Sequence, residues 1–138
     1  MPTHSYRLTE SSAEDLSMES DWKKFRVMVP VLRERYLEER NARIATLLTD
    51  PKKNHTERFW DAMDKMEQEA RVLRQCLDGH SRSKMWIYML TMIRAGMLKP
   101  EDLAEFSEEL QKKFTYAFSE IEGLTSYHSA RPPDGASK

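Results

Sequence analysis

The chain has 138 residues, a length that corresponds to one domain with a single hydrophobic core. Hydrophobic residues make up 39% of it and charged residues 33%, and the formal net charge of −1 excludes a general electrostatic attraction to nucleic acid or to anionic membranes. The only cysteine, Cys76, cannot form an internal disulfide, and the first twelve residues contain no apolar run. We therefore expect a cytoplasmic protein without a secretory signal or a membrane anchor.

A first helix is predicted over residues 21–49, with Ser20 as its N-cap. Residues 1–18 before it are polar and lack apolar periodicity, which predicts a disordered segment. The apolar residues of the helix recur at helical spacing: Trp22, Phe25, Val29, Leu32, Tyr36, Ile44 and Leu47. Pro30 lacks a backbone donor and clashes with the preceding turn, so we predict a kink or a break near it.

A second helix is predicted over residues 56–78, with Thr56 as its cap and Asp78-Gly79 at its end. Its apolar residues alternate in steps of four and three: Phe59, Met63, Met66, Ala70, Leu73 and Leu77. This spacing is typical of coiled coils and antiparallel bundles. We interpret the row as the face that packs against neighbouring helices.

The stretch from Met85 to Leu98 is the most apolar in the chain, and we place a third helix around it, over residues 82–96. Across residues 85–93 only Thr91 is neither apolar nor aromatic. A helix that is apolar on all sides is expected to be buried on all sides. The stretch is shorter than the roughly 20 residues that a bilayer requires. It is therefore predicted to be the central helix of the fold.

A fourth helix is predicted over residues 100–122, because Pro100 is followed by Glu101 and Asp102, a pattern typical of a helix start. Gly123 ends it, and residues 124–138 are turn-rich and polar, which predicts a disordered tail. The predicted fold is thus all-α, a four-helix array in one domain over residues 19–123.

Charge is unevenly distributed along the chain. Residues 22–49 contain seven basic and three acidic residues, whereas residues 101–122 contain seven acidic and two basic residues. Basic and acidic faces that pack beside each other explain this asymmetry. The alternative is that the basic first helix and the loop over residues 52–58 contact nucleic-acid phosphates. Acidic residues interspersed along the first helix make nucleic acid the less favoured partner, and the apolar third helix cannot serve as a recognition helix.

The turn before the third helix is the most site-like stretch: His80, Ser81, Arg82, Ser83 and Lys84. Hydroxyl and basic side chains next to a helix N-terminus can complete an anion-binding site. The stretch lacks the glycine spacing of a phosphate-binding loop, so the alternative is a capped turn between two helices. The four histidines are scattered, and no base accompanies Cys76, so we predict no metal, no cofactor and no catalytic activity.

Large flexible and aromatic side chains are abundant, with nine Met and three Trp. Met suits adaptable binding surfaces, and Trp is enriched at interface hot spots. We interpret four residues as partner-binding: Trp60, Met63, Met66 and Trp22. The alternative is that they are needed for the core.

The sequence favours a non-catalytic interaction or regulatory module that binds another protein or a second copy of itself; the alternative is a nucleic-acid-associated regulator.

Overall fold

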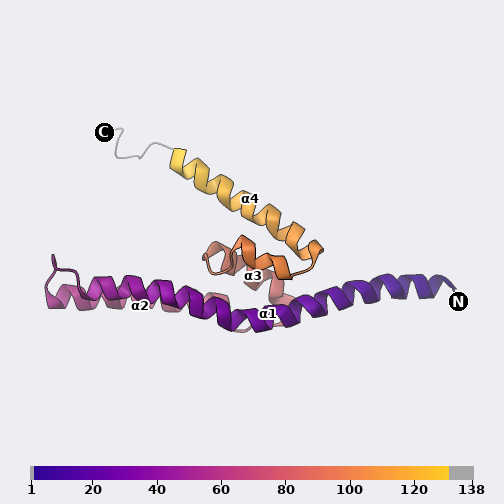
Figure 1. The fold of residues 1–138 in the computed structure, drawn as a ribbon, viewed down its shortest axis with the longest axis horizontal. Helices are drawn as coiled ribbons and strands as arrows, with labels where there is room; N and C mark the ends of the chain where they lie inside the picture. Colours follow the sequence, from indigo (N-terminus) through magenta and orange to yellow (C-terminus); the bar gives the residue numbers. More distant parts are fainter. Residues whose placement is uncertain (1, 131–138) are drawn as a thin grey trace. The chain divides into compact units, whose positions relative to one another are not determined.

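The structure is a computed structural model that describes the backbone of residues 2–130 and the side chains of residues 16–120. All regular secondary structure in this part of the chain is helical and none is strand (Figure 1), which confirms the predicted all-α class. The elements are α1 (Pro2–Leu48), α2 (His55–Leu77), η1 (Arg82–Lys84), α3 (Met85–Arg94), η2 (Pro100–Glu105) and α4 (Glu108–Ala130), where η marks a 3-10 helix. None of the described helices combines the length and the apolar character needed to cross a membrane.

The described residues divide into two compact units, residues 1–98 and the part of the chain that follows, and each unit is described by itself. The first contains α1, α2, η1 and α3, and the second contains η2 and α4. The boundary falls inside the range 19–123 that the sequence assigned to one domain. The prediction of a single domain stays a prediction.

Helix α1 is longer than predicted. It begins at Pro2, so residues 2–18 are helical in the structure rather than disordered, and Ser20 lies inside the helix instead of capping it. The helix continues through Pro30, so of the predicted kink or break the structure contains no break. Pro30 cannot donate a hydrogen bond to the preceding turn, and Figure 1 shows α1 bending in its middle, as expected of a proline kink.

Helices α1 and α2 form an antiparallel hairpin joined by the loop over residues 49–54 (Figure 1). The N-cap of α2 is Asn54, two residues before the predicted Thr56. Its side chain accepts a hydrogen bond from the Glu57 backbone (2.8 Å), and the Glu57 carboxylate accepts one from the Asn54 backbone (3.1 Å). This reciprocal capping box satisfies two free donors of the first turn. The helix ends as predicted, with Gly79 at a φ of 78°.

The core of the first unit lies where the hairpin meets α3. Buried side chains come from α1, α2 and α3 and from the two residues at the end of the unit: Phe25, Leu32, Tyr36, Ile44, Ala62, Cys76, Met85, Met89, Met92, Ile93, Met97 and Leu98. Four of the seven apolar positions predicted for the first helix are in this set, so the predicted face of α1 is confirmed there.

Helix α3 is shorter than predicted, and its burial is one-sided. Residues 82–84 form η1, the α-helix spans only Met85–Arg94, and Gly96 follows with a φ of 76°. Met89 and Met92 are fully buried, whereas Ile87 is 61% exposed and Trp86 38% exposed. The prediction of burial on all sides is therefore wrong. One hairpin can cover only one side of a short helix, whatever the composition of the other sides.

The second unit divides the predicted fourth helix in two. Pro100 opens η2, and the Lys99 backbone donates to the Asp102 carboxylate at 2.7 Å. Phe106 is extended, and the Ser107 hydroxyl then accepts a hydrogen bond from the Leu110 backbone at 3.3 Å in the first turn of α4. Buried residues of this unit are Leu103, Phe106, Leu110, Phe114 and Ala117. Helix α4 continues past the predicted end to Ala130, and the rest of the predicted tail, residues 131–138, lies outside the described residues.

Candidate functional site

The face of α2 that packs against α1 is not the face predicted from its apolar residues. Burial follows a row that also alternates steps of four and three but lies one residue earlier: Arg58, Ala62, Lys65, Glu69, Val72 and Cys76. Ala62, Glu69 and Cys76 are buried, and the other three are half-buried. A shift of one residue rotates a helix by about 100°, so the predicted row is turned away from this contact. The prediction of the packing row is wrong.

A buried polar cluster marks this contact. The Tyr36 hydroxyl donates to Glu69 Oε2 at 2.5 Å, and the Arg40 Nε lies 3.5 Å from the same oxygen. The Lys65 Nζ lies 3.5 Å from Glu69 Oε1, and the Arg40 guanidinium stands 4.6 Å from the centre of the Tyr36 ring. Burial and the hydrogen bond to the Glu69 carboxylate raise the pKa of Tyr36 to about 12. The cluster sets which residues of α1 and α2 lie opposite each other.

Glu69 was not among the predicted packing residues, because its charge is typical of a surface residue. One signal was available in the sequence. Ala62 and Cys76 lie seven residues before and after Glu69, and two small residues at heptad spacing let a neighbouring helix approach closely. The apolar row was more conspicuous because it contains larger side chains.

Two of the three predicted partner-binding residues of α2, Trp60 and Met66, are exposed, and so is Phe59 beside them. Phe59 is 50% exposed, Trp60 57% and Met66 51%, and Met63 is half-buried. The Trp60 ring meets the Phe59 ring edge-on, with the centroids 5.0 Å apart. Trp22 is separate from these residues: it is half-buried beside Phe25, near the opposite end of the hairpin. The structure thus brings three of the four predicted residues together on one helix.

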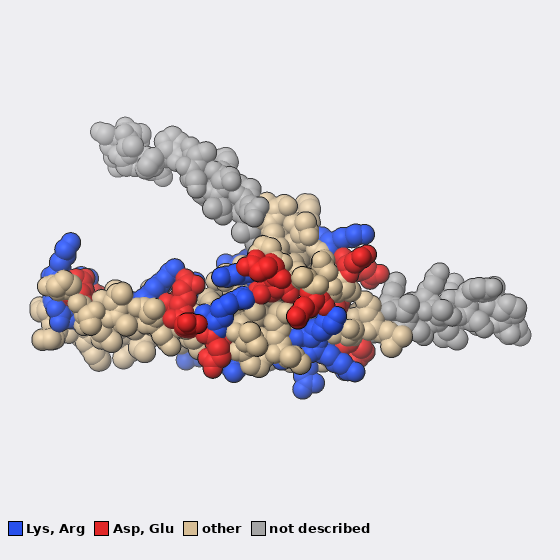
Figure 2. Space-filling view, viewed as in Figure 1, with Lys and Arg blue, Asp and Glu red and all other residues tan. Residues whose placement is uncertain are grey.

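Residues of α1 extend this exposed region. In an antiparallel helix pair, the residues that directly follow the contact positions of both helices lie on the same side of the pair. On the outer half of the hairpin, this rule groups residues of α1 and α2 that we call the uncharged side: Leu37, Asn41, Ala45, Leu48, Phe59, Met63, Met66 and Ala70. None of the eight is charged and none is buried. Figure 2 shows an uncharged stretch on the outer part of the hairpin, between charged side chains at the loop end and others toward the middle, on the face that it displays.

Helix α3 packs against the other side of the hairpin. Arg35 directly precedes the contact residue Tyr36, and its guanidinium donates to the Met97 carbonyl at 2.9 Å, just beyond the end of α3. Leu37, which follows Tyr36, belongs to the opposite side of α1. Within the first unit, the uncharged side is therefore not the side that α3 covers.

Several basic residues of α1 and the 49–58 region are engaged within the first unit. These interactions are Arg35 with Met97, Arg40 with Glu69, Arg43 with Glu39 (2.6 Å), Lys53 with Asp61, and Arg58 with the Asp50 carbonyl (2.7 Å). A guanidinium or ammonium group in such a pair is less available to a phosphate. The geometry therefore weakens the electrostatic argument for nucleic-acid binding.

The turn predicted to bind an anion is docked onto α1. The His80 ring nitrogen Nε2 lies 2.6 Å from the Cys76 carbonyl, and the ring packs between Phe25 and Tyr88, with centroids 5.0 and 4.5 Å away. Arg82 pairs with Glu19 at 2.9 Å. The Ser81 hydroxyl is buried and has no hydrogen-bond partner in the described residues, while Ser83 and Lys84 are exposed. These contacts hold the turn in place, and anion binding there stays a prediction.

Two further features bear on catalysis. Burial raises the pKa of the Cys76 thiol to about 11, so the thiol is protonated and weakly nucleophilic at neutral pH. Within the described residues, no three His, Cys, Asp or Glu side chains form a group that could hold a metal ion.

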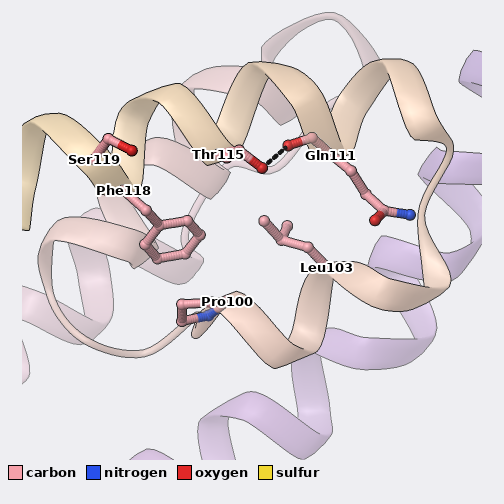
Figure 3. Close-up of a pocket in the computed structure, with 6 residues that line it drawn as sticks. All are labelled: Pro100, Leu103, Gln111, Thr115, Phe118 and Ser119. Atoms are coloured by element: carbon pink, nitrogen blue, oxygen red, sulfur yellow. Dashed lines mark hydrogen bonds between the residues drawn. The ribbon is translucent and has the colours of Figure 1, made fainter.

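A shallow cavity of about 240 Å³ lies between η2 and α4 in the second unit (Figure 3). Its lining residues are Pro100, Leu103, Gln111, Thr115, Phe118 and Ser119. Gln111 donates to the Phe106 carbonyl at 2.7 Å, and Thr115 donates to the Gln111 carbonyl at 2.8 Å. These side chains are thus already hydrogen-bonded, and none of the lining residues is ionisable. The cavity can hold a small apolar group but offers no acid or base.

Comparison with known proteins adds no further constraint: the sequence matches no protein-family model, and no curated protein or solved structure shows significant similarity to it.

Proposed function

We propose that this protein is a non-catalytic interaction module that binds a helical protein segment on the uncharged side of its hairpin. The observation that carries the proposal is the exposure of Phe59, Trp60 and Met66, each of which keeps half or more of its side-chain surface accessible. Exposed apolar side chains that cluster rather than scatter are typical of interaction sites. Aromatic residues and Met are also enriched where interfaces form.

The form of the surface favours a helix as its ligand. Two nearly parallel rows of side chains, one from α1 and one from α2, extend along the hairpin axis. A third helix that lies along such rows buries its own apolar face without leaving backbone groups unpaired. The Met side chains adapt to the shape of the partner, and Trp60 lies at the border of the surface, next to Phe59.

Affinity capture from a cell lysate, with and without nuclease, tests this proposal. We expect the immobilised protein to retain a protein partner in the presence of nuclease. Trp60→Ala removes an aromatic contact and should weaken this capture by about 2 kcal/mol, the usual threshold of a hot spot. Val27→Ala is the matched control, because Val27 is 75% exposed on α1 and does not belong to the uncharged side.

Two results would contradict the proposal. One is that neither a lysate protein nor a second copy of the chain is captured. The other is that nuclease or moderate salt abolishes the capture, since binding to phosphates falls steeply with salt. The second result would favour the alternative function, a nucleic-acid-associated regulator that uses the basic residues of α1 and the 52–58 loop.

A further inference from the structure

We infer that the partner of the uncharged side is a second copy of the same chain, bound antiparallel, with α2 against α2 and the two loops at opposite ends. The inference rests on the proposed function, because it names the partner of the same surface. Two properties of α2 carry it: the symmetry of its outward row and the order of the charges beside that row.

The outward row of α2 is the row that the sequence analysis singled out: Phe59, Met63, Met66, Ala70, Leu73 and Leu77. Its residues are spaced symmetrically about residue 68. A twofold axis at that level sets Met66 against Ala70 of the second copy, and Met63 against Leu73. A large side chain opposite a small one is the arrangement in which two helices interdigitate. A twofold interface also closes on itself, so association stops at the dimer.

Four exposed charges border this row, in the order acid, acid, base, base: Asp64, Glu67, Arg71 and Arg74. Their side chains form no ion pair with the described part of the chain. In the antiparallel arrangement, the acids of one copy lie within a turn of the bases of the other, on both halves of the interface. In a parallel arrangement, these charged borders would lie on opposite sides of the helix pair, so the charges of the two copies would not meet. Opposite charges stabilise and like charges destabilise such neighbours, so the charge order favours the antiparallel dimer.

Trp60 belongs to the same border. With the twofold axis at residue 68, it lies near Arg74 of the second copy, and the face of an indole ring attracts a guanidinium group. Trp60 therefore contributes to this interface both by burying apolar surface and by its contact with Arg74.

Sedimentation equilibrium of the purified protein with two charge-reversed variants tests the arrangement. The acid-reversed variant carries Asp64→Lys and Glu67→Lys, and the base-reversed variant carries Arg71→Glu and Arg74→Glu. We expect the parent to dimerise and each variant alone to dimerise more weakly, by on the order of tenfold, because each then opposes like charges. An equimolar mixture of the two variants should recover the parental affinity as a heterodimer.

A control variant separates this effect from that of net charge. Glu109→Lys with Glu120→Lys changes the net charge as much as the acid-reversed variant does, at exposed positions of α4. It should dimerise like the parent. Thermal melts monitored by circular dichroism establish that each variant is folded, and recovery in the mixture shows independently that both variants are competent to bind.

The outcomes distinguish this inference from the proposed function. If the parent is monomeric, or if both reversed variants dimerise as tightly as the parent, the antiparallel dimer is wrong. The parent can still capture a protein from the lysate in the presence of nuclease, and Trp60→Ala can weaken this capture. In that case the proposed function stands, and the partner is a different protein. If the parent neither dimerises nor captures a protein, both the inference and the proposed function fail.

Discussion

The two rows of α2 have the same spacing and contrasting compositions, and the structure packs the more polar one against α1. The inward row contains Arg58, Lys65 and Glu69, whereas the outward row has no charged residue. Small side chains at Ala62 and Cys76 allow the two helices to approach closely, and α1 supplies partners for the Glu69 carboxylate. The comparison teaches that the most apolar row of a helix need not be the row that packs within its own chain.

The largest expected effect comes from removing the centre of the inward row. Glu69→Ala leaves the buried Tyr36 hydroxyl and the half-buried cations of Arg40 and Lys65 without their common acceptor. We expect a loss of about 3–5 kcal/mol in the free energy of unfolding, measured by urea denaturation. Glu69→Gln retains an acceptor for the Tyr36 hydroxyl and should cost less. If Glu69→Ala unfolds at the same urea concentration as the parent, the cluster does not hold the hairpin together.

The second prediction concerns alkaline pH. The pKa of Tyr36 is raised from 10.0 to about 12, so the folded state favours the protonated phenol. The contribution of the protonated Tyr36 to the free energy of unfolding is fully present below pH 10. It is lost as the pH rises through 12, because the phenolate would then be buried beside the Glu69 carboxylate. We expect stability to fall by about 2–3 kcal/mol across this range. Urea unfolding of Tyr36→Phe over the same range is the control, and an equal loss there would assign the effect to other groups.

The third prediction compares two alanines on the same helix. Ala62 in the inward row is 3% exposed, so Ala62→Leu should overpack the contact and cost about 1–3 kcal/mol. Ala70 in the outward row is half-buried, and Ala70→Leu should change stability by no more than about 0.5 kcal/mol. Thermal melts of both variants, at concentrations at which the protein is monomeric, give the comparison. Equal losses would contradict the assignment of the two rows.

The smallest expected effect is on the outward row itself. Met66 is 51% exposed, so Met66→Gln should leave the stability of the monomer within about 0.5 kcal/mol of the parent. The measurement is urea unfolding at concentrations at which the protein is monomeric. A loss of 2 kcal/mol or more would show that Met66 belongs to the core of its own chain, and would remove it from the uncharged side.

Predictions that depended on local chemistry were the most accurate. The all-α class and the apolar face of α1 were predicted from periodicity, and the end of α2 from Gly79, whose positive φ requires a residue without a side chain. Predictions at helix starts were less accurate. Asn54 rather than Thr56 caps α2, because the reciprocal bond with Glu57 selects one of several polar residues that could cap this turn.

The assignment of four residues to partner binding stays a prediction, and the structure bears only on their exposure and position. Trp60, Met63 and Met66 were assigned to partner binding, and all three lie at least partly in solvent, whereas Trp22 lies apart from them. The uncharged side was not predicted, because it combines residues of α1 and α2 whose proximity depends on the register of the hairpin. That register depends on the contact between Tyr36 and Glu69, which no periodicity reveals.

The helical class of the chain follows from local sequence, because a helix depends on interactions between residues three and four apart, whereas several helix boundaries differ from the predicted ones. For α2 and α3, in contrast to α1, the buried side depends on tertiary packing and differs from the side that the apolar pattern predicts. Ile87 lies in the most apolar stretch and is exposed, while Glu69 is charged and buried. Whether a side chain is buried depends on which other helix packs against it. That packing depends on the size and the hydrogen-bonding groups of residues that are distant in the sequence. The partial exposure of the apolar row of α2 is therefore a property of the fold, and of no single segment.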